Sequence, residues 1–273
     1  MKDDLGKRMK EQYEQRTRTF LPRRTYTIIR LDGKAFHTFT RNMKRPYDED
    51  FMTAMDNTAR FLCKEIQGCK LAYVQSDEIS LLLTDFDKIT TDAWFDGQVQ
   101  KMVSVAASMA TAMFNKEMLI INMAKTRNVA AVDNTELFPA DMESVVIRNP
   151  LAFFDARIFT IPDPVEVENY FVWRQKDAVR NSLSMTAQSV FSHAKLHAKS
   201  QSDMHDMLHN EGVNWNDLPE GFKRGRTITP KALRLSTEGM SYAFADGNWH
   251  ITAPDFLKQR ELLTGLIPKI NYE

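Results

Sequence analysis

The sequence contains few cysteines and no long apolar run. Cys63 and Cys69 are its only two cysteines, too few for a disulfide scaffold and not spaced as zinc ligands, so we expect two reduced thiols. No apolar stretch approaches the roughly 18 residues of a membrane span. The first residues, MKDDLGKRMKEQ, are charged where a signal peptide needs an apolar segment. These absences predict a cytoplasmic protein with no membrane partner.

The chain also lacks a net charge, because 36 Lys and Arg balance 36 Asp and Glu. Its 273 residues, 43% of them hydrophobic, are typical of one large folded domain or two small ones. A polyanionic partner would therefore have to be bound by a local basic patch. The segment 221–234 is such a patch or an ordinary solvated surface. Its bases are Lys223, Arg224, Arg226, Lys231 and Arg234.

Apolar periodicity predicts an alternation of strands and helices. Four short runs are rich in apolar and β-branched residues, which is typical of strands, and two longer segments repeat their apolar residues at helical spacing. The strands are expected at 25–31, 69–74, 79–84 and from Leu151 onwards, and the helices at 49–66 and 97–118. This order, β-α-β-β-α-β, is the ferredoxin-like pattern, so we expect an α+β fold.

Two adjacent acids, Asp77 and Glu78, stand between the second and third predicted strands, and Asp32 ends the first. In the ferredoxin-like pattern the first and second strands run parallel, with the third antiparallel between them. The end of the first strand and the turn after the second therefore share one sheet edge. We expect the three carboxylates to lie close together, which is costly unless a cation neutralises them.

Hard oxygen ligands without a nearby His or Cys suit Mg²⁺. Two such ions, about 3.5–4 Å apart, would hold the attacking and leaving oxygens of a phosphoryl or nucleotidyl transfer. No Walker-type loop occurs, but Gly33 follows the first strand, and the backbone N–H groups of 33–37 could bind a triphosphate. Arg45 is a further candidate phosphate ligand. Asp32-Gly33 and Ser76-Asp77-Glu78 could each be an ordinary polar turn. Because both are expected at the same edge of the sheet, a metal site is favoured.

Four motifs occur in order between about Arg30 and Asn181: RLDGKAFHTF, YVQSDEISLLL, FFDARIF and YFVWRQKDAVRN. Together they resemble the tRNA-His guanylyltransferase family, in particular its prokaryotic and viral tRNA guanylyltransferase-like members. FKRGRTI extends the likeness toward the C-terminus. The resemblance implies a polymerase-palm-type catalytic core over residues 20–160. Residues 161–273 are expected to form a helical and β C-terminal extension packed on that core.

The resemblance implies a nucleotidyltransferase that extends tRNA at its 5′ end, in the 3′-to-5′ direction. A 5′-monophosphorylated end is activated by ATP or GTP, and the 3′-hydroxyl of an incoming nucleoside triphosphate then attacks it. Asp32 and Asp77 match the metal-binding aspartates of the family, and Gly33 the glycine whose carbonyl completes a metal shell. Glu78 matches the acidic neighbour needed for full activity, so the resemblance implies Asp32, Asp77 and Glu78 as catalytic residues. The family also implies two Mg²⁺ ions, nucleoside triphosphates and tRNA as substrates, and a homotetramer, because one tRNA spans several subunits.

Two of the predicted nucleotide-binding residues, Arg45 and Asp48, lie beyond the loop that follows the first strand. Arg45 replaces the usual Lys of the family, which keeps the charge and changes the geometry of a phosphate contact. Asp48 falls where the family contacts the base. The full set expected to bind the nucleotide is Gly33, Lys34, Ala35, Phe36, His37, Arg45, Asp48 and Ser76.

The RNA contacts are expected in the second half of the chain. Val179-Arg180-Asn181-Ser182 replaces the His-Ile-Asn-Asn run of eukaryotic members, and so resembles members that repair 5′-truncated tRNAs on a template. Tyr170 and Trp173 could stack on bases, although aromatics three residues apart more often pack into a core. The predicted RNA-binding residues are Arg174, Arg180, Asn181, Lys195, Lys199, Lys223, Arg224 and Arg226.

Two other classes of function stay open at this point. One is a nucleotide cyclase or forward polymerase-like enzyme on the same palm-type fold. The other is a non-catalytic RNA-binding protein with a dead site, against which the presence of Asp32, Asp77 and Glu78 argues.

Overall fold

The computed structural model describes residues 4–132, 150–230 and 249–270. One antiparallel sheet of six strands forms its centre, in the order β4-β1-β3-β2-β5-β6. The first four strands in this order form the predicted ferredoxin-like arrangement, with β3 between β1 and β2. The strands are β1 (Tyr26–Gly33), β2 (Cys69–Gln75), β3 (Glu78–Leu83), β4 (Phe154–Ile161), β5 (Arg226–Thr229) and β6 (His250–Thr252).

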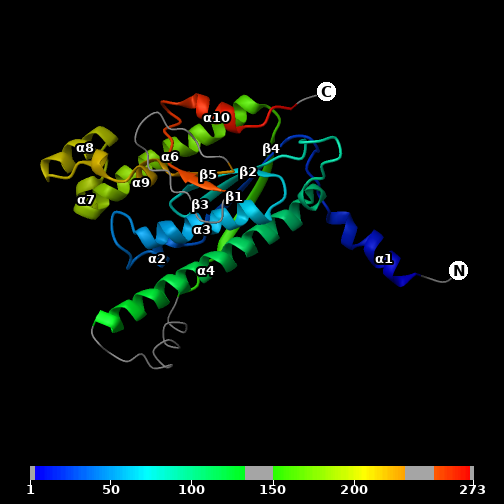
Figure 1. Ribbon diagram of the computed structural model, residues 1–273, viewed down its shortest axis with the longest axis horizontal. Helices are drawn as coiled ribbons and strands as arrows, with labels where there is room; N and C mark the ends of the chain where they lie inside the picture. Colours follow the sequence, from blue (N-terminus) through cyan, green and yellow to red (C-terminus); the bar gives the residue numbers. More distant parts are fainter. Residues whose placement is uncertain (1–3, 133–149, 231–248, 271–273) are drawn as a thin grey trace.

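Helices cover both faces of the sheet, with α3 and α4 on one face and α6 and α10 on the other (Figure 1). The helix expected at 97–118 continues to Val132, and the fourth strand begins at Phe154 rather than at Leu151. The α-helices are α1 (Leu5–Gln12), α2 (Phe36–Phe39), α3 (Glu49–Glu65), α4 (Val99–Val132), α6 (Pro164–Val190), α7 (His193–Leu196), α8 (Gln201–Asn210), α9 (Glu220–Arg224) and α10 (Arg260–Leu266). Short 3-10 helices are η1 (Glu14–Thr17), η2 (Trp94–Gly97) and η3 (Trp215–Asp217).

Because both faces are covered, the central strands are apolar on both sides. In β1, Ile28 packs into the cluster under α6 and α10, whereas Ile29 and Leu31 pack into the cluster under α3 and α4. The alternation follows from the two-residue period of a strand. It fixes the register of β1 and therefore the position of Asp32 at its end.

The helices that frame the site begin at clear N-caps. The Asp48 carboxylate accepts the N–H groups of Asp50 and Phe51 at the start of α3. Asp163 accepts the N–H of Val165 at the start of α6, where Pro164 occupies the first turn. Such caps satisfy N–H groups that have no partner within the helix, and so set where each helix starts.

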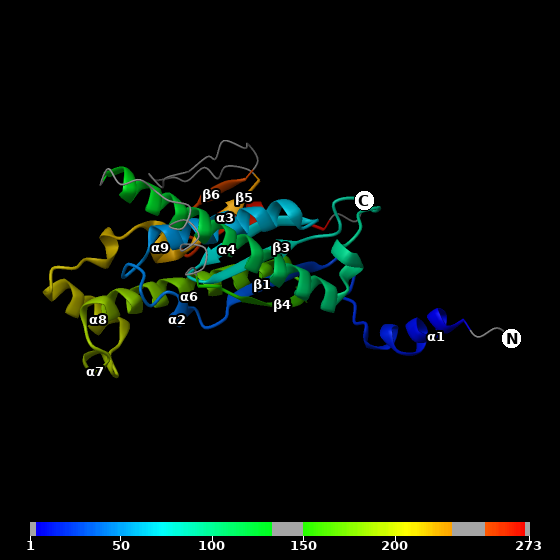
Figure 2. The same ribbon diagram turned by 90° about the horizontal axis from the view of Figure 1, so that it is seen from below.

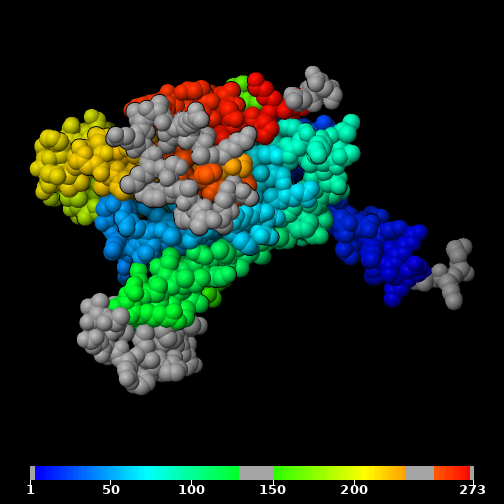
Figure 3. Space-filling model, in the orientation of Figure 1, coloured from blue at the N-terminus to red at the C-terminus, as the bar shows by residue number. Residues whose placement is uncertain are grey.

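The C-terminal extension belongs to the same sheet as the core. β5 pairs with β2, and β6 pairs with β5. A third apolar cluster, which includes Leu183 and Trp215, joins the end of α6 to α8; α7, α8 and α9 lie at this end of the molecule (Figure 2). At the other end, α1 projects from the body (Figure 3) and has no buried residue. None of the described helices is long and apolar enough to cross a membrane.

Candidate active site

The three predicted acids meet at one edge of the sheet. Asp32 in β1 lies opposite Glu78 in β3, which in turn lies opposite Gln75 in β2. Between β2 and β3 the chain turns through Ser76 and Asp77, with Ser76 at a positive φ of 46°. The Gly33 N–H donates to the Asp77 carbonyl oxygen at 3.1 Å, which ties the end of β1 to this turn. The proximity predicted from the strand order is therefore confirmed.

Asp77 and Asp32 repel each other electrostatically. Burial, together with the Asp32 charge, raises the pKa of Asp77. No cationic side chain in the described ranges pairs with Asp77. The Asp32 side chain is 37% exposed and lies 3.6 Å from the Arg157 guanidinium of β4. The cluster thus keeps an unbalanced negative charge at Asp77.

This donor set suits a hard divalent cation. Asp32 and Asp77 offer carboxylate oxygens, and within residues 4–132, 150–230 and 249–270 no group of three or more His, Cys, Asp or Glu side chains surrounds a single point. An ion held by two carboxylates has to complete its shell with water or with oxygens of a substrate, as Mg²⁺ commonly does in nucleotide enzymes. The unbalanced charge at Asp77 is the feature that such an ion would neutralise.

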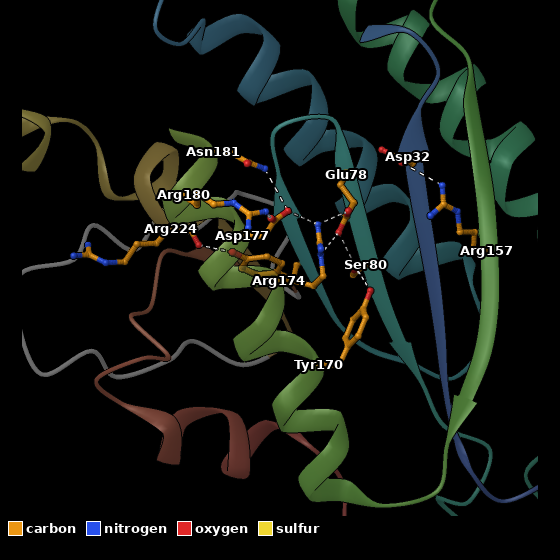
Figure 4. A network of polar contacts seen from close by, with 11 residues as sticks. Asp32, Glu78, Ser80, Arg157, Tyr170, Arg174, Asp177, Arg180, Asn181 and Arg224 are labelled. Atoms are coloured by element: carbon orange, nitrogen blue, oxygen red, sulfur yellow. Dashed lines mark hydrogen bonds and ion pairs between the residues drawn. The ribbon is translucent and has the colours of Figure 1, made fainter. Parts of the chain in front are cut away.

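Unlike Asp77, Glu78 has a cationic partner, because its carboxylate forms a buried ion pair with Arg174 (Figure 4). Arg174 of α6 donates from Nε to Oε1 at 2.8 Å and from Nη2 to Oε2 at 2.7 Å. Burial raises the pKa of Glu78, and Arg174 opposes that shift. The Ser80 hydroxyl lies 3.3 Å from the Glu78 carboxylate and 2.8 Å from the Tyr170 hydroxyl. Glu78 therefore connects the acidic edge to α6.

Arg174 continues this connection along its own helix. Its Nη2 also donates to Asp177 at 3.0 Å, and Asp177 accepts from Arg180 and from Asn181 as well. The Arg174 side chain is only 8% exposed. The expectation that Arg174 contacts RNA does not fit this position, because the guanidinium is buried between two carboxylates. Arg180 and Asn181, by contrast, are exposed.

A cavity of about 560 Å³ opens beside the turn between β2 and β3. Seven of the eight predicted nucleotide-binding residues line it, and Lys34 does not. The backbone N–H of Gly33 donates to Asp77, and that of Lys34 donates to the Phe153 carbonyl at 2.8 Å. Among the described residues, the N–H groups of Ala35, Phe36 and His37 have no partner. The predicted anion-binding loop is therefore shorter than expected, at 35–37.

Gly33 is required by close packing at this loop. A Cβ atom on Gly33 would lie 2.3 Å from the ring of Phe36, nearer than any real contact allows. Phe36 is buried among other rings, with centroids 5.1 Å from Phe154 and 5.5 Å from Phe114. The absence of a side chain at Gly33 thus lets the chain turn from β1 into α2 directly beside the acids.

The far wall of this cavity comes from the C-terminal extension, which local sequence motifs did not predict. Ala178, Asn181, Ser182, Met185 and Gln188 line it from α6. Their spacing repeats with the helical period, which is the one signal that could have placed them on a common face. Phe222 of α9 also lines the cavity, and its ring centroid lies 5.1 Å from that of Tyr47.

Two of the predicted nucleotide ligands have different surroundings. Arg45 is exposed on the cavity wall. Asp48 lines the cavity while both carboxylate oxygens accept backbone N–H groups, from Lys44 on one side and from the start of α3 on the other. The side chain of Asp48 therefore shapes the loop that contains Arg45.

The basic stretch predicted to bind RNA is mostly paired with acids. Lys223 and Arg224 form ion pairs with Glu220, and Arg226 donates to Asp56 of α3 at 2.5 Å. Lys223 and Arg226 are buried. As a basic surface this prediction is therefore wrong for 223–226, because acids from the fold neutralise these bases. Lys231 and Arg234 lie outside the described residues. Lys195 and Lys199 are exposed.

A second cavity, of about 590 Å³, adjoins the first across Asp77. Both cavities are lined by Ser76 and Asp77 from the turn and by Asn181, Met185 and Gln188 from α6. The second cavity is also bordered by Asp32 and Glu78. Asp77 is thus accessible from both cavities, whereas Asp32 and Glu78 border only the second.

Comparison with known proteins relates this site to one family. Residues 6–162 match the sequence model of the family described as tRNAHis guanylyltransferase. The match covers both β1 with its loop and the acidic turn. The chain belongs to the tRNAHis guanylyltransferase family. The family consists of transferases, so this guanylyltransferase-family chain is an enzyme of that class, as the motifs indicated.

Individual relatives extend beyond the residues of the family match. The tRNA(His) guanylyltransferase of Debaryomyces hansenii is 31% identical over 235 residues, which are 81% of this chain and 78% of the relative. The structure of a bacterial tRNA(His) guanylyltransferase-like protein in complex with ATP superposes with a TM-score of 0.77 at 38% identity, covering 97% of this chain and all of the other. A complex of such a protein with GTP gives a TM-score of 0.69 at 36% identity, over 98% of this chain and all of the other. The C-terminal extension is therefore shared with these bacterial proteins.

Proposed function

We propose that this protein adds nucleotides to the 5′ end of tRNA in the 3′-to-5′ direction and depends on Mg²⁺. The observation that supports this most strongly is the pair Asp32 and Asp77 in a chain of this family: Asp77 lines both adjoining cavities and Asp32 lines the second. The family takes its name from guanylylation of tRNAHis, and related structures contain ATP or GTP. ATP or GTP would activate the 5′ end and nucleoside triphosphates would be added, in the cytoplasm.

The first cavity would bind the incoming nucleoside triphosphate. The free N–H groups of 35–37 and the exposed guanidinium of Arg45 are suited to its phosphates, because both are donors that favour negative charge. Asp48 and Ser76 line the same cavity. The 3′-hydroxyl would then lie toward the acidic edge, where the second cavity opens.

Asp32, Asp77 and the Gly33 carbonyl would hold two Mg²⁺ ions, which supply charge stabilisation to the transferring phosphate and activate the attacking hydroxyl. Asp32 and Asp77 would also orient the reacting groups, since Asp32 lies on a strand end fixed by the register of the sheet and the turn with Asp77 is tied to that end by the Gly33 N–H. Glu78 would act through Arg174, which holds α6 against the acidic edge. It is proposed as a positioning residue, although the sequence predicted a catalytic one.

The RNA would approach along α6 and the helices that follow it. Arg180, Asn181, Lys195 and Lys199 are exposed there and suit the phosphates of a polyanion. Core and extension would work as one unit, because α6 contributes to both cavities. A homotetramer would let one tRNA span several subunits.

Light scattering tests whether the protein is a tetramer, and a mass near the 31.5 kDa of one chain would contradict a tetramer.

The decisive experiment uses a 5′-monophosphorylated tRNA that lacks its first nucleotide. The RNA is incubated with protein, Mg²⁺, ATP and each nucleoside triphosphate in turn, and product length is measured at single-nucleotide resolution. We expect growth at the 5′ end, with the nucleotide complementary to the facing base. Growth should stop when Mg²⁺ is replaced by EDTA, and in Asp77→Asn.

The matched control is Asp155→Asn, which removes an exposed carboxylate opposite Asp32 on β4 without touching either cavity. It should extend the RNA normally. The absence of growth with the natural sequence, even on a 5′-triphosphorylated RNA that needs no activation, would contradict the proposal. Extension at the 3′ end or a cyclic nucleotide product would instead favour a forward polymerase or a cyclase.

A further inference from the structure

Trp173 of α6 is the only aromatic side chain on the described wall of the second cavity. It is 52% exposed, whereas its neighbour Tyr170 is buried. Their spacing suggested that both residues pack into the core, but only Tyr170 does so. Its exposed face is available to a ligand in that cavity.

The indole is held in place on its buried side. The Tyr170 ring meets it edge to face, with centroids 5.9 Å apart and planes at 62°. The Arg174 guanidinium lies 4.5 Å from the indole centroid, and Glu78 fixes that guanidinium in turn. Within the described residues, the indole N–H has no hydrogen-bond partner. Trp173 is thus a fixed aromatic surface with an open side next to the acidic edge.

The chemistry of the second cavity indicates which group would cover this surface. Its polar wall carries Asp32 and Asp77, where a cation and a phosphate would meet, and Trp173 provides a flat apolar surface beside them. A nucleobase joined to that phosphate matches both, because every base can stack on an aromatic side chain. Two ligands have this chemistry, the 5′-terminal nucleotide of an RNA and a second nucleoside triphosphate.

The surroundings of Trp173 favour the RNA. Lys176 and Arg180 are exposed on the same helix within two turns of Trp173; Arg180 pairs with Asp177, whereas Lys176 forms no ion pair within the described residues. A free nucleotide would not reach these charges, whereas the backbone of a longer strand would. We propose that Trp173 stacks on the base of the 5′-terminal nucleotide of the RNA acceptor and so positions its 5′ phosphate at Asp32 and Asp77. This inference rests on the proposed function.

The test compares two RNAs that differ only in the first base. One is a 5′-triphosphorylated truncated tRNA, which needs no activation, and the other carries an abasic residue at its 5′ end. On the first RNA, Trp173→Ala should lower kcat/KM for RNA by about 10- to 100-fold, the usual range for losing one stacked base. On the abasic RNA the same substitution should have little effect. The KM for the incoming nucleoside triphosphate should not change.

Two further variants separate stacking from a structural role. Trp173→Phe keeps an aromatic face and should recover most of the activity. Val165→Ala removes a side chain of the same 52% exposure from the same helix but away from both cavities, and should behave like the natural sequence. An equal loss on both RNAs would overturn the inference. It would also be overturned if the loss appeared only with monophosphorylated RNA and disappeared at high ATP, because the stacked base would then be that of the activating nucleotide.

A binding measurement keeps the inference testable even if the natural sequence extends no RNA. A short 5′-phosphorylated RNA is titrated into the protein in the presence of Mg²⁺ but without nucleoside triphosphates, and tryptophan fluorescence is recorded. Quenching that is strong in the natural sequence and lost in Trp173→Phe would support the stacking, because only Trp173 among the tryptophans lines the second cavity. Equal quenching in both proteins would overturn it. If the natural sequence extends no RNA but its quenching is lost in Trp173→Phe, the proposed function is rejected and the stacking of Trp173 is retained.

Discussion

At Asp77 the requirements of function and of stability oppose each other. Burial and the Asp32 charge raise the pKa of Asp77, so its ionised form weakens the metal-free fold. A carboxyl group whose pKa is raised by folding makes its full contribution to the stability of the fold below its unfolded pKa. This contribution is lost as the pH rises through the folded pKa. At pH 7 and in EDTA, Asp77→Asn should therefore have a Tm a few degrees higher than that of the natural sequence.

Thermal melting over a range of pH checks the sign of this effect. The difference in Tm should shrink as the pH falls through the raised pKa of Asp77 and vanish below the ordinary Asp value of 3.8, because Asp77 is then neutral in both states. Addition of Mg²⁺ should raise the Tm of the natural sequence but not that of the variant, since binding to the folded state alone stabilises it. A lower Tm for Asp77→Asn at pH 7 without metal would contradict the prediction. Asp155→Asn serves as the control with an exposed carboxyl.

Glu78 and Arg174 are expected to behave as one buried ion pair. Arg174→Met leaves the Glu78 carboxylate buried without its guanidinium and should lower the free energy of unfolding by about 3–5 kcal/mol. The double variant with Glu78→Gln no longer buries this charge, so it should be more stable than Arg174→Met alone. Urea denaturation of the single and double variants measures this coupling.

The same variants separate positioning from metal binding. Glu78→Gln retains an oxygen that can accept from Arg174, so it should keep measurable nucleotide addition, unlike Asp77→Asn. If the double variant lost as much stability as the sum of the two single variants, Glu78 and Arg174 would not behave as an ion pair. A Glu78→Gln protein that is folded but as inactive as Asp77→Asn would favour a direct catalytic role for Glu78 instead.

At the scale of elements, the junction of β1 with α2 depends on the missing side chain at Gly33. In Gly33→Ala the new Cβ would be forced against the Phe36 ring, 2.3 Å away, and Phe36 cannot yield because other rings surround it. Overpacking of this kind usually costs about 1–3 kcal/mol. Because α2 and its loop line the first cavity, where we propose that the nucleotide binds, activity should fall more steeply than stability.

Gly265→Ala is a matched control for this substitution. Gly265 lies in α10, and no atom would come within 4 Å of a Cβ there. Alanine favours helices over glycine by about 1 kcal/mol, so this variant should be as stable as the natural sequence or slightly more stable. Chemical denaturation and nucleotide addition measured on both variants decide the matter. A Gly33→Ala protein with unchanged stability would show that the loop can move away from Phe36.

The strands and helices around the acidic edge could be predicted from the sequence because their signals are local. The periodicity over 25–31 and 49–66 reflects which face each element buries, and the order of elements then places Asp32 beside Asp77. Pairing between distant side chains carries no such signal. Nothing near Arg174 indicates that its partner is Glu78, and nothing near Arg226 indicates Asp56. For that reason the sequence alone does not show that the bases of 223–226 are paired with acids.

At the scale of the whole molecule, the family match and the folding unit do not coincide. The match ends at residue 162, directly before α6 begins. Yet α6 and α10 bury one face of the strands β1 to β4, including Ile28 and Tyr73, against Phe171 and Leu263. A chain cut at this point would leave that face in water, and an apolar patch of such size favours aggregation.

A fragment of residues 1–162 should therefore be insoluble or melt without a cooperative transition, although it holds Asp32 and Asp77 and all residues predicted to bind the nucleotide. The control is a fragment of residues 20–273, which loses α1, a helix without buried residues, and should melt like the full chain. Circular dichroism during heating compares the three proteins. A soluble 1–162 fragment with a cooperative transition would mean that the core folds alone. In that case α6 would serve the active site only as the wall of its two cavities, and not as part of the core that keeps the acids in register.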